Sequence, residues 1–60
     1  MSKVERVARV LDSWAIINEE VAAALEREDA RNNQDRVKTL RCDAQEYRTL
    51  AGQVRELETN

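Results

Sequence analysis

The chain has 60 residues, of which 42% are hydrophobic, but only one Trp, one Tyr and no Phe. A chain this short buries only about 60% of its unfolded surface, so without disulfides or metals it usually gains stability by oligomerising. Ten basic and twelve acidic side chains give a formal net charge of −2, which excludes a strongly basic nucleic-acid-binding composition and a strongly acidic mimic of DNA.

The few chemically special residues point away from metal and redox chemistry. Cys42 is the only cysteine and histidine is absent, which excludes an intramolecular disulfide and the usual zinc sites. We therefore expect no cofactor. We find no signal peptide and no apolar run near the roughly 20 residues that span a bilayer, which predicts a soluble, cytoplasmic protein.

The first predicted helix covers about residues 3–29. The stretch Ser2-Lys3-Val4-Glu5 matches a capping box, in which the Ser2 hydroxyl accepts from the Glu5 amide and the Glu5 carboxylate returns to the Ser2 amide. Apolar residues then follow at a 3-4 spacing, which a helix turns into one face. We predict that this face is the oligomer interface, formed by Val4, Val7, Leu11, Trp14, Asn18, Val21 and Leu25.

Asn18 is the polar exception on this face. A buried amide there needs a partner across the interface, and such residues often fix register or oligomeric state. The alternative is that Asn18 tilts toward a solvated edge. Trp14, near the middle of the same face, is expected to pack in the core, with a binding hot spot as the alternative.

Alanines line one edge of this face at every seventh residue. Their small size predicts helix axes near the lower end of the roughly 8–10 Å range for packed helices. A stripe of acidic residues runs beside the alanine edge. The alanines are Ala8, Ala15 and Ala22, and the acids are Glu5, Asp12, Glu19 and Glu26.

A turn is predicted at about residues 30–33. Ala30 is the only apolar residue between Glu26 and Arg36, and Asn32-Asn33 disfavours helix interiors and tolerates turn conformations. The alternative is one long helix, because this gap has no Gly or Pro and the apolar faces on either side stay roughly in phase. A continuous helix would leave this polar segment without a packing partner.

The second predicted helix covers about residues 34–58 and has a narrower apolar stripe. Its Ala44 and Ala51 are seven residues apart and can face the alanine edge of the first helix in an antiparallel hairpin. We therefore predict an all-α fold, a single helical-hairpin domain over residues 1–60. The apolar surface left over predicts a homodimer, or a higher oligomer, in which two hairpins form an antiparallel four-helix bundle.

In length, hairpin plan and heptad pattern, the chain resembles the Rop family of plasmid copy-control proteins. Members of that family are helical hairpins that dimerise into four-helix bundles and bind paired RNA loops. The resemblance implies the same architecture here and makes RNA a possible ligand. It assigns no RNA-binding residue to this chain.

Arg41, Arg48 and Arg55 follow a seven-residue spacing that places them about 10 Å apart along the second helix. Such a line could follow an RNA backbone, because each neutralised phosphate releases counterions. The alternative is that these arginines pair with the acidic stripe of the first helix and set the orientation of the hairpin. The RNA hypothesis also lacks a stacking aromatic, because Tyr47 belongs to the apolar stripe.

Ile16 and Ala23 occupy positions where a simple bundle would carry polar residues. An apolar spot rimmed by charge is typical of a small interaction site. The alternatives are a singly exposed isoleucine or additional core in a higher oligomer. The candidate partner surface consists of Arg9, Ser13, Ile16, Glu20 and Ala23.

No pattern here indicates catalysis. Cys42 lacks a histidine base or a second cysteine, and no predicted cleft would desolvate a pair of carboxylates. We expect a small non-enzymatic regulatory or inhibitory protein that binds another protein through an exposed helical face. By analogy, small adaptors and inhibitors of this kind are encoded by phages and plasmids. The alternatives are a Rop-like RNA-binding regulator and a structural oligomerisation module.

Overall fold

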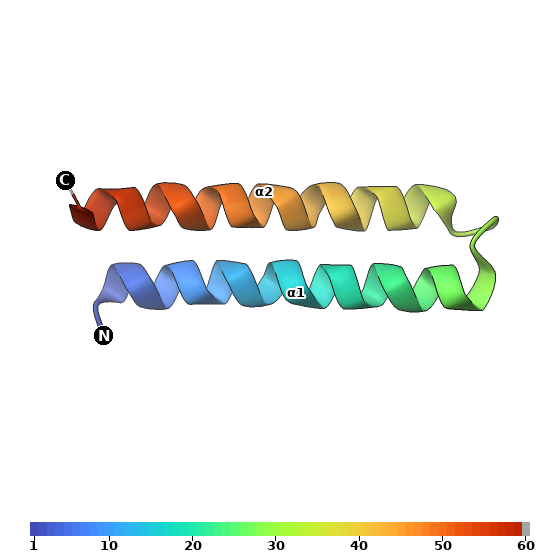
Figure 1. Ribbon diagram of the computed structural model, residues 1–60, viewed down its shortest axis with the longest axis horizontal. Coiled ribbons are helices and arrows are strands. Elements are labelled where there is room, and N and C mark those ends of the chain that lie inside the picture. The colour runs from blue at the N-terminus through green and yellow to red at the C-terminus, as the bar shows by residue number, and fades with distance from the viewer. Residues whose placement is uncertain (60) are drawn as a thin grey trace.

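The computed structural model describes residues 1–59, and these residues form two helices and no strand. The helices are α1, Lys3–Asp29, and α2, Gln34–Thr59, and they lie side by side as an antiparallel hairpin of 45 × 16 × 9 Å (Figure 1). The prediction of an all-α helical hairpin is confirmed, and the alternative of one long helix is wrong. Neither helix is long and apolar enough, over the described residues, to cross a membrane.

The start of α1 is fixed by Ser2. This residue has an extended backbone, its hydroxyl accepts from the Glu5 amide at 3.0 Å, and its carbonyl accepts from the Arg6 amide at 3.1 Å. The predicted return bond from the Glu5 carboxylate to the Ser2 amide does not form among the described residues. Both carboxylate oxygens of Glu5 instead accept from Arg55 of α2, because a charged donor makes a stronger hydrogen bond than a backbone amide.

The turn at residues 30–33 is held by side-chain amides. Asn33 donates from its side chain to the carbonyl of Leu25 at 2.9 Å, and its own carbonyl accepts from the Val37 amide at 2.9 Å. Asn33 therefore ties the last part of α1 to the start of α2. Asn32 binds the Asp29 carboxylate through its backbone at 3.3 Å and its side chain at 2.7 Å. No residue from 1 to 59 has positive φ, so this turn requires no glycine.

Small side chains close the contact between the two helices. Ala8, Ala15 and Ala22 of α1 and Ala51 of α2 are fully buried, and Ala44 is 2% exposed. This confirms that the alanine edges face each other, as the seven-residue spacing predicted. The other buried apolar residue of the described chain is Val37, near the turn.

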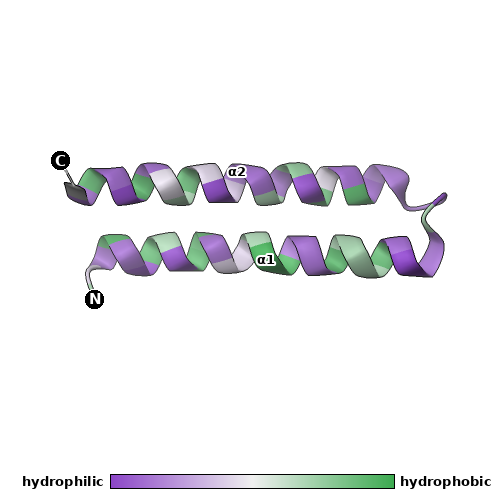
Figure 2. Ribbon diagram, in the orientation of Figure 1, coloured by the Kyte–Doolittle hydropathy of each residue, from purple (hydrophilic) through white to green (hydrophobic). Residues whose placement is uncertain are grey.

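The large apolar side chains lie outside this narrow contact. The hydrophobic residues are more abundant along α1, whereas α2 and the turn are mostly hydrophilic (Figure 2). We call the exposed apolar side chains on the side of the hairpin opposite the arginines the apolar face. Its side chains are 44–72% exposed in the hairpin and comprise Val7, Val10, Trp14, Ile17 and Val21 of α1 with Leu50 and Leu57 of α2.

Candidate functional site

The hairpin has two unlike sides, separated by the row of buried alanines. One side, the ion-pair side, is crossed by bonds between the acidic stripe of α1 and the arginines of α2. At its open end, the Arg55 guanidinium donates to both oxygens of Glu5 at 3.1 and 3.2 Å and to Asp12 at 2.9 Å. One arginine therefore holds two carboxylates that lie two helical turns apart.

The remaining arginines continue the same row toward the turn. Arg48 pairs with Glu19, and Arg41 pairs with Glu26. Hydrogen bonds from Arg55 hold the pKa of Glu5 below its ordinary value, and a bond from Arg41 does the same for the pKa of Glu26. These carboxylates therefore stay ionised to lower pH than free glutamates.

This row bears on the RNA hypothesis. All three arginines of the predicted line already contact carboxylates of their own chain, as the ion-pair alternative anticipated. An RNA phosphate would have to compete with those carboxylates for the guanidinium groups. The geometry thus gives the arginine line a structural role in the hairpin.

The opposite side of the hairpin carries the apolar face. Trp14 and Tyr47 meet there edge to face, with ring centroids 5.6 Å apart, yet Trp14 remains 49% exposed. Among the predicted interface residues, Val7 and Val21 are exposed like Trp14. The others are half-buried beside α2, namely Val4, Leu11, Asn18 and Leu25. The hairpin alone therefore leaves about half of this predicted interface open to solvent.

The candidate partner surface lies on the far side of α1 from the apolar face. Successive residues of a helix turn by about 100°, so Ile16 points nearly opposite to Trp14 and Asn18. Ile16 is 48% exposed, and Arg9, Ser13 and Glu20 around it are also exposed. Ala23 is half-buried. The Ser13 hydroxyl donates to the Arg9 carbonyl at 2.9 Å, so it is already satisfied within its own helix.

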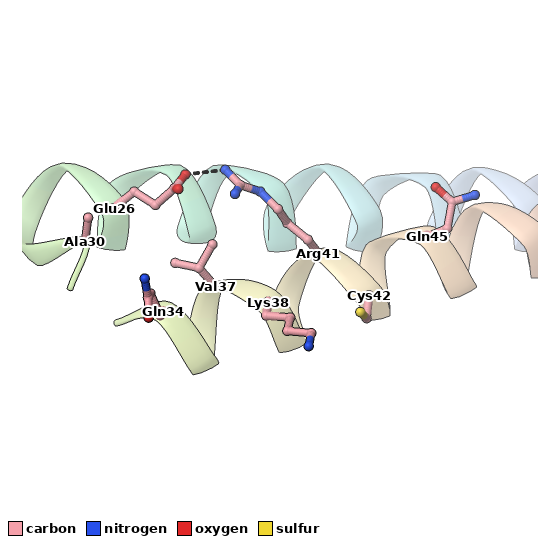
Figure 3. A pocket seen from close by; sticks show the side chains of 8 residues that line it. All are labelled: Glu26, Ala30, Gln34, Val37, Lys38, Arg41, Cys42 and Gln45. Atoms are coloured by element: carbon pink, nitrogen blue, oxygen red, sulfur yellow. Dashed lines mark hydrogen bonds and ion pairs between the residues drawn. The ribbon is translucent and has the colours of Figure 1, made fainter. Parts of the chain in front are cut away.

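Ile16 and Ala23 of α1, with Ala30 directly after its end, form an outer row with seven-residue spacing. At the turn end, this row reaches a shallow groove between the helices (Figure 3). The Glu26–Arg41 ion pair crosses the groove, and Val37 points toward α1 below it. The groove is lined by Glu26, Ala30, Gln34, Val37, Lys38, Arg41, Cys42 and Gln45.

Sequence reasoning missed this groove and the double contact of Arg55. The groove forms where α2, from Gln34 to Gln45, meets the turn and the end of α1, and no periodic pattern marks such a junction. The signal for Arg55 was present, since four acids face three arginines. This count predicts that one arginine binds two acids. Which arginine does so depends on the register of the two helices.

No protein-family model, curated protein or solved structure matches this chain.

Proposed function

We propose that this protein is a non-enzymatic regulatory or inhibitory protein that works as a homodimeric four-helix bundle and binds another protein through the outer row of α1. The observation that carries the proposal is the division of exposed apolar residues between two opposite sides of α1. The apolar face serves self-association, and Ile16 remains accessible on the other side.

The surface area of the hairpin supports self-association. A folded monomer of this size is expected to expose about 4,000 Å², whereas this hairpin exposes 4681 Å². The excess of about 700 Å² is close to the roughly 800 Å² that each partner buries in a standard interface. Trp14, Ile17 and Val21 are 49%, 53% and 44% exposed on the apolar face, and large exposed apolar patches typically mark interaction sites.

The composition of the outer row supports a protein partner. Ile16 supplies an apolar anchor, and the charged side chains of Arg9 and Glu20 surround it. An apolar centre with a polar rim is the usual anatomy of a transient protein interface. The adjoining groove extends this surface to the turn, which gives a partner both an anchor point and a recess.

Two adjacent isoleucines allow a matched test. Ile16 and Ile17 are 48% and 53% exposed, but they lie on the outer row and the apolar face respectively. Under the proposal, Ile16→Glu keeps the dimer and loses the partner, whereas Ile17→Glu dissociates the dimer. Light scattering behind a size-exclusion column measures the oligomer, and affinity purification of each variant measures partner loss. Dissociation of the Ile16→Glu dimer would show that Ile16 is core and refute the partner surface.

The same size-exclusion experiment distinguishes RNA binding from protein binding. Protein prepared at low salt without nuclease is monitored at protein and nucleic-acid wavelengths. A dimer that carries nucleic acid removable by high salt would favour RNA binding, because phosphate contacts weaken with salt. The triple variant with Arg41, Arg48 and Arg55 changed to Gln would then lose the nucleic acid. A nucleic-acid-free dimer that retains no protein partner would favour a structural oligomerisation module.

A further inference from the structure

Two polar groups on α1 lie within the apolar face or at its edge. Trp14 carries an indole N–H, which can only donate, and Asn18 carries an amide, which can donate and accept. Neither side chain has a hydrogen-bond partner among the described residues of the hairpin. Water can reach both residues in a single hairpin, since Trp14 is 49% exposed and Asn18 is half-buried. Once a second copy covers the face, both need partners from that copy.

The bounds of α1 bring these two groups together in a symmetric dimer. The widest apolar stripe of the hairpin belongs to α1, so α1 of one copy packs against α1 of the other. A two-fold axis across the helices makes that pair antiparallel. Full overlap of two antiparallel Lys3–Asp29 helices places Lys3 level with Asp29 of the second copy and Trp14 level with Asn18 of the second copy.

The charges along α1 agree with this overlap. Residues 3–9 carry Lys3, Arg6 and Arg9 against Glu5, and residues 26–29 carry Glu26, Glu28 and Asp29 against Arg27, so the first end of α1 is net basic and the last end is net acidic. An antiparallel pair therefore brings basic and acidic ends together on both sides of the axis. Such complementarity suppresses wrong registers more than it adds affinity.

We propose that, in the dimer, the Trp14 indole N–H donates to the Asn18 carbonyl oxygen of the second copy. Symmetry makes two such bonds, one on each side of the two-fold axis. Asn18 is thus a specificity-determining residue of the apolar face: it accepts the one polar group that the face of α1 presents, and any other register leaves both groups buried without partners. This inference rests on the proposed dimer.

The test is a double-mutant cycle on the dissociation constant of the dimer, with Trp14→Phe, Asn18→Leu and the combined variant. A typical hydrogen bond changes an equilibrium constant about fivefold, so two symmetric bonds predict a coupling of roughly 25-fold between the two sites. Trp14→Phe with Leu25→Ala is the matched control, because Leu25 lies one heptad from Asn18, and this pair should be additive within about twofold. If the protein is a dimer and the effects of Trp14→Phe and Asn18→Leu on its dissociation constant are additive, the proposed hydrogen bond is wrong. The proposed dimer would still stand.

A spectroscopic measurement keeps the test independent of variant stability. The single tryptophan gives one indole N–H resonance, which should exchange slowly with water in the wild-type dimer. The exchange should slow as protein concentration drives dimer formation. A dimer whose indole N–H exchanges as fast as in free tryptophan contradicts the inference, whereas a monomer at all concentrations contradicts the proposed function itself.

Discussion

Enlarging one buried alanine should separate the two helices. Ala22 has no exposed surface in the contact with α2, whereas Ala24, two residues further along, is exposed. Ala22→Leu adds three carbon atoms where the opposing helix leaves no space. Overpacking of this kind costs about 1–3 kcal/mol. Because 1 kcal/mol shifts the melting temperature of a domain this small by roughly 4–8 °C, we expect a fall of about 4–24 °C.

Ala24→Leu is the control for this change. Both substitutions alter the intrinsic helix propensity equally, so the difference between them isolates the helix contact. The assay is thermal unfolding followed by far-ultraviolet circular dichroism, at one protein concentration because oligomerisation shifts apparent stability. A melting temperature for Ala22→Leu equal to or above that of Ala24→Leu would refute the close contact of the alanine edges.

Three further changes test other parts of the hairpin. Gly52→Ala should stabilise it by up to about 1 kcal/mol in urea unfolding, because an added Cβ meets no atom within 4 Å. Asn33→Ala should cost about 1 kcal/mol in the same assay, because it removes the bond between the turn and the Leu25 carbonyl of α1. The lowered pKa values of Glu5 and Glu26 stabilise the fold above the unfolded value of about 4.5, so the melting temperature should fall as the pH drops through and below it. Arg55→Gln should flatten part of that fall, because its hydrogen bonds are the main cause of the shift at Glu5.

The small core of the hairpin leaves two different exposed surfaces on α1. Alanine contacts bring the helices close but bury little apolar area, so the large side chains remain on the outside. The exposed side chains of the apolar face can then be buried by a second copy in the proposed dimer. Ile16 stays available because a residue two positions from Trp14 points to the opposite side of the helix.

Much of the architecture was determined by the sequence itself, because it depends on local interactions. Ser2 caps the first helix through a bond to a residue three positions away, and Asn32-Asn33 interrupts the helical pattern at the turn. The seven-residue alanine spacing predicted which edges of the two helices meet. These features need only the helical period and the preferences of neighbouring residues.

Tertiary structure decided how the helices are matched. The antiparallel register places the Arg55 guanidinium beside Glu5 and Asp12, so Arg55 binds both carboxylates. Glu5 therefore binds Arg55 in place of the predicted bond to the Ser2 amide. In the tertiary structure, the Asn33 side chain also binds the carbonyl of Leu25, eight residues earlier. Heptad spacing orders residues along one helix, whereas the offset between two helices depends on the packing of the alanines and the geometry of the turn.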